Sequence, residues 1–281
     1  MSILAVVFGN LKASAIAKAG KGARIKNVFF LLHGDHPSLP AGEVKAIMEA
    51  EEIPHRIKQT LPQVLRGSLD TMNAPTILRR AYMARLCAEE LFIVEKDFTE
   101  ILSAVDDTFT TSPDTGGSFS LSLHQVQRSA QDIDLKTLKR RITENILTRT
   151  RAEVNTENPS TRLIGIFSEG FFLFGRLVAE APPKRLIERK PSGRPFFHPT
   201  SLQPKLAGCM INLTRVSAGE VLLDPFCGAG SILIEAGFLD CRAVGADIEA
   251  KMVKGARLNL LHYGVDCILF RADARRLPLS Y

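Results

Sequence analysis

Hydrophobic positions follow two periods along the first 180 residues and predict two small α/β units. Apolar runs or polar–apolar alternation typical of β-strands occur at residues 28–32, 63–69, 118–126, 163–167 and 170–178. The last two of these segments predict a hairpin. Apolar residues at helical spacing occur at residues 41–51, 74–92, 97–109 and 135–148. We therefore expect one unit at 27–95 and a second at 96–180, after a loose N-terminal arm at 1–26.

From Glu220 onward the pattern changes to strands that alternate with helices. Strands are expected at 221–223, 241–245 and 267–270, and helices at 231–239 and 251–263. A further helix is expected just before them, at 202–213. Alternation of this kind is typical of a parallel, doubly wound sheet. The fold class is therefore a multidomain combination of α/β and α+β units.

Charge is concentrated in one part of the chain. The 281 residues carry a formal net charge of +6, and their length allows two or three domains of roughly 100–150 residues each. The segment 176–215 holds eight basic and two acidic residues, so it alone carries +6. A solvated face explains such a run about equally well, but its prolines and Gly193 favour a connector, which can bind phosphates.

Cysteine spacing and hydropathy argue against several classes of protein. The five cysteines contain no CxxC pair, and the histidines show no metal-ligand spacing. We therefore expect no metal site and no disulfide framework, which fits a reducing, cytoplasmic location. No apolar run approaches the roughly 18 residues of a membrane span, so we expect no membrane partner.

The central chemical motif is a strand, an acid and a glycine turn that opens a helix, Val221-Leu222-Leu223-Asp224-Pro225-Phe226-Cys227-Gly228-Ala229-Gly230-Ser231. Glycines allow the backbone to approach a ligand closely, and a helix N-terminus offers free N–H groups. A dinucleotide fingerprint would need a third glycine where Leu233 stands, which disfavours a nicotinamide oxidoreductase. Asp224 would repel a pyrophosphate but suits the ammonium and sulfonium groups of S-adenosylmethionine.

Two further aspartates follow predicted strands. Asp247 ends the second strand of the series and can accept from both ribose hydroxyls of a nucleoside. Asp273 follows the third strand and can accept from an adenine amine. A helix N-cap explains any one of these aspartates equally well. Three acids at three successive strand ends favour a cofactor site.

These motifs resemble those of known methyltransferases. Residues 224–236, Asp247 and Arg271-Ala272-Asp273-Ala274 resemble motifs one to three of the class I methyltransferases. The run Arg194-Pro195-Phe196-Phe197-His198-Pro199-Thr200-Ser201-Leu202-Gln203-Pro204-Lys205-Leu206 resembles the archaeal tRNA guanine-10 N2-methyltransferases, as does Met252-Val253-Lys254-Gly255-Ala256-Arg257-Leu258-Asn259-Leu260. Leu32-His33-Gly34-Asp35-His36-Pro37 resembles the ferredoxin-like start of that family, and residues 96–180 resemble its THUMP domain. The resemblance covers residues 27–281.

The resemblance implies an architecture. It comprises a flexible arm at 1–26, a ferredoxin-like N-terminal domain at 27–95, a THUMP RNA-binding domain at 96–180, a basic linker at 181–200 and a partial, Rossmann-like class I methyltransferase domain at 201–281. The implied activity is S-adenosylmethionine-dependent methylation of a guanine exocyclic amine in tRNA, at position 10. We expect a monomer with tRNA as its partner.

The resemblance also implies site residues. Asp224, Gly228 and Gly230 would hold the methionine end of S-adenosylmethionine, Asp247 its ribose and Asp273 its adenine. Neighbouring positions assigned to the same site are Phe226, Cys227, Ile248 and Ala274. Residues expected to contact RNA are Arg140, Arg141, Lys184, Arg185, Arg189, Lys190 and Arg194.

One expected motif does not occur in these 281 residues. Enzymes of this type use an Asp/Asn-Pro-Pro-aromatic run after the fourth strand of the sheet to bind a flipped guanine. Ala181-Pro182-Pro183-Lys184 lacks the acid, and Asn158-Pro159-Ser160 lacks the second proline. We therefore name no catalytic residue and expect a C-terminally truncated, inactive chain. We also expect the strand at 221–223 to be an unpaired, aggregation-prone edge.

Two other functions remain open at this point. The chain could be a non-catalytic RNA-binding protein with a relic cofactor fold, or a methyltransferase for an rRNA guanine or another tRNA guanine. The sequence does not decide whether one or two methyl groups are added.

Overall fold

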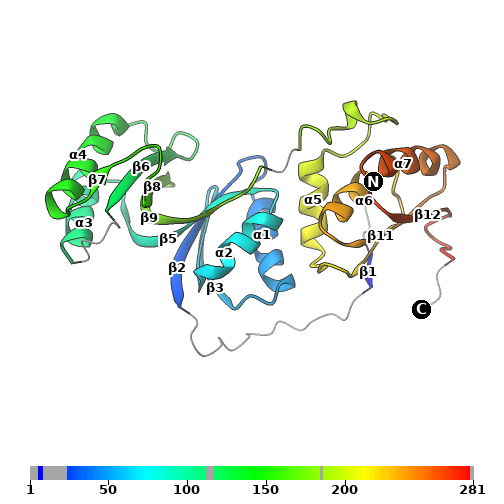
Figure 1. Ribbon diagram of the computed structural model, residues 1–281, viewed down its shortest axis with the longest axis horizontal. Coiled ribbons are helices and arrows are strands. Elements are labelled where there is room, and N and C mark those ends of the chain that lie inside the picture. The colour runs from blue at the N-terminus through cyan, green and yellow to red at the C-terminus, as the bar shows by residue number, and fades with distance from the viewer. Residues whose placement is uncertain (1–5, 9–23, 112–116, 184–185, 279–281) are drawn as a thin grey trace.

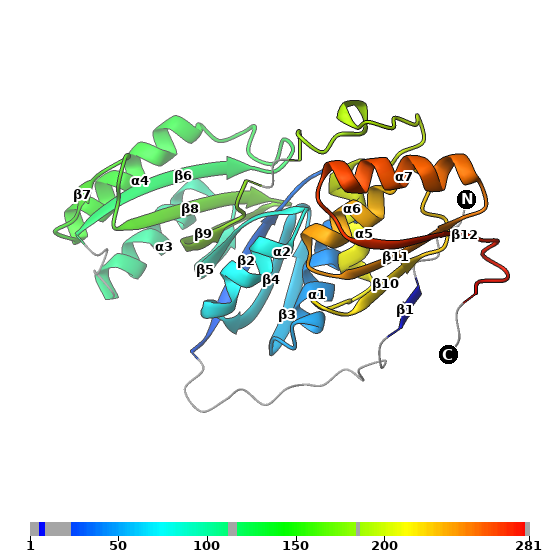
Figure 2. The same ribbon diagram turned by 45° about the vertical axis from the view of Figure 1, so that its right-hand side comes forward.

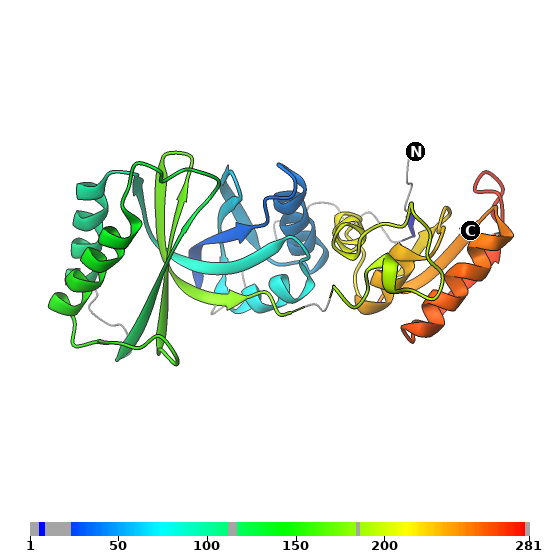
Figure 3. The same cartoon turned by 90° about the horizontal axis from the view of Figure 1, so that it is seen from above.

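The molecule is elongated and contains two β-sheets (Figures 1 and 3). A computed structural model describes residues 6–8, 24–111, 117–183 and 186–278. One sheet has eight strands in the order β3-β4-β2-β5-β9-β8-β6-β7, and the other has four in the order β1-β10-β11-β12. None of the described helices is both long and apolar enough to cross a membrane.

The first half of the large sheet carries two helices on one face. Its strands are β2 (Ile25–Leu32), β3 (His55–Leu61), β4 (Val64–Asp70) and β5 (Ala84–Glu95), and its helices are α1 (Leu39–Ala50) and α2 (Ala74–Arg80). Alternate side chains of β2, including Val28 and Phe30, pack against Val44 and Ile47 of α1 and Ile77 of α2. This core holds the N-terminal unit together.

The second half continues the same sheet. It contains α3 (Phe98–Thr111), β6 (Ser118–Gln125), α4 (Leu135–Arg149), β7 (Glu153–Val154), β8 (Thr161–Ser168) and β9 (Phe171–Glu180). The expected hairpin is confirmed, because β8 and β9 pair antiparallel from Leu163–Arg176 to Ser168–Phe171. β9 then pairs with the long strand β5 over its whole length. The two predicted α/β units are therefore joined by one continuous sheet.

The four-stranded sheet contains the parallel strands expected after Glu220. Its elements are α5 (Pro204–Leu213), β10 (Val221–Asp224), α6 (Ser231–Phe238), β11 (Arg242–Asp247), α7 (Ala250–His262) and β12 (Cys267–Arg271). β10 pairs parallel with β11, and β11 with β12. The three helices lie on one face of this sheet (Figure 2).

A buried polar interface joins the two halves of the molecule. Glu43 of α1 is fully buried and accepts hydrogen bonds from the backbone N–H groups of Tyr82 and Met83, at 2.9 and 2.7 Å. It also accepts from Nδ2 of Asn212 in α5, at 2.8 Å. Arg80 donates to Oδ1 of the same asparagine at 2.8 Å. Because each buried polar group has a partner, the interface fixes α5 against the N-terminal unit.

The expected helix over 74–92 is wrong in its second half. Helix α2 ends at Arg80, and residues 84–95 form β5, with Cys87 and Ala88 buried. This segment is rich in Ala, Leu and Glu, which favour helices locally. Backbone pairing with β2 on one side and β9 on the other overrides that preference. The edge strand β3, whose exposed positions are polar, was not predicted at all.

The expected unpaired edge at 221–223 is also wrong. Strand β1 (Val6–Phe8) pairs antiparallel with β10, in the register Val6–Leu223 to Phe8–Val221. Part of the N-terminal arm therefore belongs to the fold, while residues 1–5 and 9–23 lie outside the described residues. The pairing follows from the free N–H and C=O groups of an apolar strand, which attract a further strand.

We predict that Gly175→Ala destabilises the shared sheet. A Cβ at Gly175 would lie 2.4 Å from the Glu89 carbonyl oxygen and 2.7 Å from the Phe29 ring. Overpacking of this kind costs about 1–3 kcal/mol of unfolding free energy, which urea denaturation measures. Gly193→Ala is the control, because nothing lies within 4 Å of its added Cβ. Equal unfolding free energies for the two variants would contradict this packing.

Candidate cofactor-binding site

The carboxyl ends of β10 and β11 bring the glycine turn against two of the predicted acids. In the parallel pairing, Asp224 lies beside Gly245, two residues before Asp247. Oδ2 of Asp247 accepts a hydrogen bond from the backbone N–H of Gly228 at 2.9 Å. The turn after the first strand is thus held on the end of the second. In open parallel sheets this edge is where ligands bind.

Asp224 is a buried acid whose pKa is raised above its usual value. Its side chain is 3% exposed, and its Oδ1 accepts from the backbone N–H of Phe226 at 3.1 Å. Burial, and to a smaller extent the charge of Asp247, raises the pKa of Asp224 to about 6. A cationic group placed beside this carboxylate would offset the cost of burying its charge.

The other two acids are more accessible and already hold backbone groups. Oδ1 of Asp247 accepts from the backbone N–H of Glu249 at 2.9 Å, so each oxygen of Asp247 has one backbone donor and capacity for a second. Asp273 accepts hydrogen bonds from the guanidinium and, with a smaller effect, from the backbone N–H of Arg275, which lower its pKa to about 2. A ligand amine at Asp273 would share that carboxylate with the exposed Arg275 side chain.

The glycine turn has the backbone shape that its sequence predicts. Gly228 and Gly230 have φ angles of 52° and 82°, in the left-handed region that favours glycine. A Cβ on Gly230 would also lie 3.3 Å from Cβ of Ala256 in α7. Cys227 is buried, and burial raises the pKa of its thiol, so it stays neutral and packs within the turn. Its backbone N–H donates to the Ala246 carbonyl at 2.9 Å.

Two apolar side chains beside the acids remain exposed. Phe226 and Ile248 are 56% and 57% exposed, next to Asp224 and Asp247 respectively. Exposed apolar side chains beside a polar turn are suited to contact the flat faces of a ligand. Ala274, from the same set of predicted residues, is half-buried beside Asp273.

Sequence reasoning missed the residues that support the turn from outside. Asn259 of α7 is fully buried, and its Nδ2 donates to the Ala229 carbonyl and the Phe196 carbonyl, both at 2.9 Å. Its Oδ1 accepts from the Phe196 backbone N–H at 2.8 Å. A Cβ on Gly255 would lie 2.1 Å from the Phe196 ring. The two motifs that carried the family resemblance, around Phe196 and Asn259, therefore pack against each other.

The residues expected to contact RNA fall into three groups. Arg140 and Arg141 on α4 are 65% and 51% exposed, and Lys190 is also exposed. Lys184 and Arg185 lie outside the described residues. Arg189 and Arg194 are only 7% and 5% exposed and donate to groups inside the protein, so these two guanidinium groups do not face a phosphate. Their place in the connector had suggested a surface role, but burial gives them a structural one.

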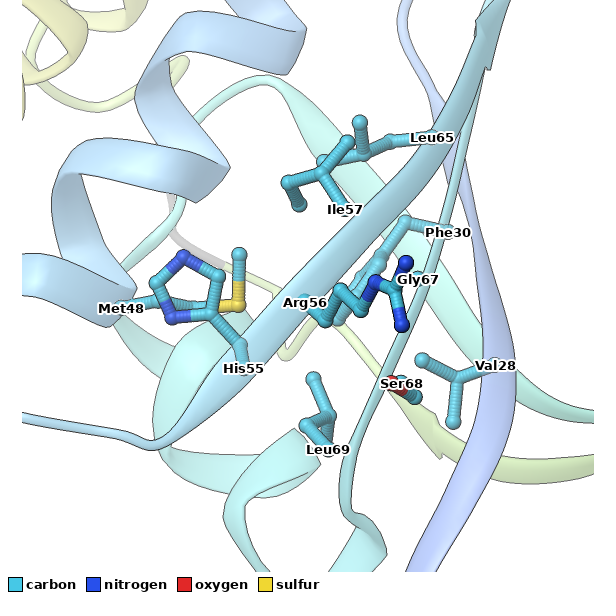
Figure 4. Close-up of a pocket in the computed structure, with 10 residues that line it drawn as sticks. All are labelled: Val28, Phe30, Met48, His55, Arg56, Ile57, Leu65, Gly67, Ser68 and Leu69. Atoms are coloured by element: carbon cyan, nitrogen blue, oxygen red, sulfur yellow. The ribbon is translucent and has the colours of Figure 1, made fainter. Parts of the chain in front are cut away.

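A small pocket elsewhere in the molecule does not share this chemistry. Figure 4 shows it in the N-terminal unit, between α1 and strands β2, β3 and β4. Its lining is mostly apolar, with His55 and Arg56 as the ionisable groups. None of the predicted site residues lines it, and Nδ1 of His55 is already 2.8 Å from the Ile53 carbonyl oxygen. Within the described residues, no group of three or more His, Cys, Asp or Glu residues is arranged to hold a metal ion.

Comparison with solved structures agrees with this architecture. A protein from Clostridium difficile 630 described as a possible methylase superposes with a TM-score of 0.54 at 16% identity, covering 92% of this chain and 78% of that one. SMU.472, described as a putative methyltransferase and solved as a complex with SAH, superposes with a TM-score of 0.51 at 12% identity, with the same coverages of 92% and 78%. Likenesses at these identities show the fold, which is that of Rossmann-like methyltransferases.

Comparison of sequences identifies the family. The RMKL-like methyltransferase domain family matches residues 191–280. The tRNA (guanine(10)-N2)-dimethyltransferase of Methanothermobacter thermautotrophicus is 34% identical over 253 residues, which are 89% of this chain and 73% of that protein. The corresponding enzyme of Methanocaldococcus jannaschii is 27% identical, over 84% of this chain and 71% of that protein. The chain therefore belongs to the family of archaeal tRNA (guanine(10)-N2)-dimethyltransferases.

Proposed function

We propose that this chain binds S-adenosylmethionine and tRNA for methylation of the exocyclic amine of a guanine, at position 10. The observation that carries the proposal is the glycine turn held by Asp247 beside the buried Asp224, in a chain of this family. The relatives are named for dimethylation of that nucleotide in tRNA. A relic fold would have no need to retain a buried, costly carboxylate at this edge.

The residues present fit the cofactor. Asp224, with its raised pKa, suits the ammonium group of the methionine end, and Gly228 and Gly230 allow close approach. Asp247 suits the two ribose hydroxyls, Asp273 the adenine amine, and Phe226 and Ile248 the ring faces. Bound S-adenosylmethionine would supply an electrophilic methyl group on its sulfonium. The protein's own residues bind and orient the cofactor, and they exclude a pyrophosphate through the charge of Asp224.

Helix α4, in the second half of the eight-stranded sheet, supplies a candidate RNA surface. We infer that residues 96–180 are the THUMP domain, that 27–95 are the ferredoxin-like domain, and that α4 presents its basic face to phosphates. Lys136, Lys139, Arg140 and Arg141 are exposed on that helix. The helix lies at the opposite end of the molecule from α7 and the cofactor turn (Figure 1). A tRNA bound on α4 would be positioned through shape and phosphates.

Methyl transfer to guanine needs groups that bind and activate the exocyclic amine. The motif expected to supply these groups does not occur in these 281 residues. The guanine amine is a poor nucleophile, because its lone pair is delocalised into the ring. No Asp/Asn-Pro-Pro-aromatic run occurs in the sequence. The described residues accordingly explain binding and orientation, and we assign no catalytic residue among them.

We predict that the 281-residue polypeptide binds S-adenosylhomocysteine and that Asp247→Ala weakens this binding by about tenfold or more, because hydrogen bonds to a charged acceptor are lost. Calorimetry measures both affinities. Asp266→Ala is the control, since Asp266 is an exposed acid at the other end of β12. Unchanged affinity in Asp247→Ala would remove this residue from the site.

In a radiolabelled-methyl assay of the 281-residue polypeptide with unmodified tRNA, we expect no turnover. Robust methyl transfer would show an acceptor site that we have not recognised.

The raised pKa of Asp224 gives opposite pH trends for affinity and stability. Affinity for the cationic cofactor should fall as the pH drops through about 6, because Asp224 becomes protonated. The folded state holds that proton more tightly than the unfolded state, so stability falls as the pH rises from 3.8 to about 6, by roughly 3 kcal/mol. Asp224→Asn should therefore be more stable than wild type at pH 8 and bind S-adenosylmethionine more weakly. A less stable Asn variant with wild-type affinity would contradict both trends.

We predict that changing Lys139, Arg140 and Arg141 together to Glu weakens the binding of all tRNAs alike. The remaining affinity should depend less on salt concentration, because fewer phosphate contacts are left to release counterions. Filter binding across a salt series measures this. The control reverses Lys251, Lys254 and Arg257 on α7, which are also exposed and change the net charge equally. Equal losses in the two variants would show a net-charge effect and not a surface on α4.

A further inference from the structure

Two arginines of the connector, Arg189 and Arg194, are buried among groups of the cofactor half. Nε and Nη2 of Arg189 donate to the two carboxylate oxygens of Glu235, at 2.9 and 3.0 Å. Glu235 lies on α6 and is fully buried. The Arg189 guanidinium also lies 4.2 Å from the ring centroid of Phe238, at the end of the same helix. A buried pair with two parallel hydrogen bonds fixes both position and orientation.

Arg194 extends this contact to the first residue of α6. Its Nη1 donates to Oγ of Ser231 at 2.6 Å, and its Nε and Nη2 donate to the Arg189 carbonyl at 3.2 and 2.9 Å. Ser231 directly follows Gly230, the last residue of the glycine turn. The connector therefore holds α6 at two places, one of them next to the turn.

The N-terminal unit joins the same cluster through Tyr82. Its hydroxyl donates to Oε2 of Glu235 at 2.8 Å, and burial raises the pKa of Tyr82, so the hydroxyl stays protonated. The Tyr82 ring also packs on Gly208 of α5, where an added Cβ would lie 2.3 Å from the ring. Three segments far apart in sequence thus meet at Glu235.

A turn built on glycines depends on such external support. Gly228 and Gly230 have positive φ angles, and glycine loses more conformational freedom on ordering than any other residue. The free amides of the turn bind a ligand well only if they are held in place beforehand. Asn259 holds the middle of the turn at Ala229, and Asp247 holds its start at Gly228. Arg194 holds its end, at Ser231.

We propose that Arg194 and Arg189 are positioning residues of the cofactor turn, and that these two side chains set the affinity of that turn for S-adenosylmethionine without touching RNA or cofactor. This inference rests on the proposed function, namely that the turn binds the cofactor. It assigns the two arginines a role that their position in a basic, proline-rich segment does not suggest.

The experiment compares the 281-residue wild type with Arg194→Gln and Ser231→Ala, which remove opposite partners of one hydrogen bond. Calorimetry with S-adenosylhomocysteine gives the affinities, and hydrogen exchange of the amides of residues 228–234 reports the turn without any ligand. We expect each variant to bind about tenfold more weakly and to exchange faster at these amides. The double variant should be little weaker than Arg194→Gln alone, because Ser231 acts on the connector through its contact with Arg194.

Arg80→Gln is the matched control for stability. Arg80 is also a buried arginine of the interface between the two halves, but it bonds Asn212, Glu51 and the Val216 carbonyl, away from the turn. We expect Arg80→Gln to lower the unfolding free energy while leaving affinity and exchange at residues 228–234 near wild type. If Arg194→Gln does not fold, Ser231→Ala carries the comparison alone, since it keeps the Arg189–Glu235 pair.

The outcomes separate this inference from the proposed function. Wild-type affinity in Arg194→Gln and Ser231→Ala, or an equal loss in Arg80→Gln, would overturn the positioning role. A wild type that does not bind S-adenosylhomocysteine would overturn the proposed function. In that case, faster exchange at 228–234 in the Arg194 and Ser231 variants, but not in Arg80→Gln, would still show that the connector holds the turn. Unchanged exchange in those variants would overturn the positioning role.

Discussion

The carboxylate of Glu235 is fully buried, and its charge must be compensated inside the protein. This requirement brings together α6, the connector and the N-terminal unit. An unpaired buried carboxylate costs several kcal/mol, so its oxygens must be neutralised and hydrogen-bonded. Arg189 of the connector supplies the charge and Tyr82 of the N-terminal unit supplies a neutral donor. Both donors reach Glu235 only when the large sheet, the connector and α6 are in their observed places. The relative arrangement of the two halves thus depends on Glu235 in addition to the contacts of Asn212 with Glu43 and Arg80.

The glycine turn of the proposed cofactor site lies at the N-terminal end of the same helix. Because Gly230 directly precedes α6, whatever fixes that helix also fixes the end of the turn. Asn259 and Asp247 fix the rest of it through backbone contacts at Ala229 and Gly228. The buried Asp224 thus lies beside a turn that these hydrogen bonds hold in place. The electrostatic cost of Asp224 is acceptable in a binding site, where a cation can offset it, and would be hard to explain in a purely structural fold.

Local patterns predicted elements well where each element depends on its own residues. The strand–turn–helix repeat after Glu220 was predicted within a few residues, because parallel strands and their helices each bury an apolar face of characteristic period. The same reasoning failed at 84–95, where helix-favouring residues form β5. Pairing with β2 and β9, which come from opposite ends of the N-terminal half, decides that segment. The pairing of β10 with β1 was missed for the same reason, since the two strands are more than 200 residues apart.

The amino-acid sequence by itself determined which acids and glycines form the proposed cofactor site. Asp224, the glycines of the turn and Asp247 are adjacent to strands along the chain, so their convergence follows from a parallel sheet alone. Only the tertiary structure decided which basic residues of the connector face solvent. Lys190 is exposed and Arg189 is buried, although they are neighbours of like charge in the same segment. The difference arises because a buried carboxylate on α6 lies within reach of one guanidinium, and no local pattern encodes that partner.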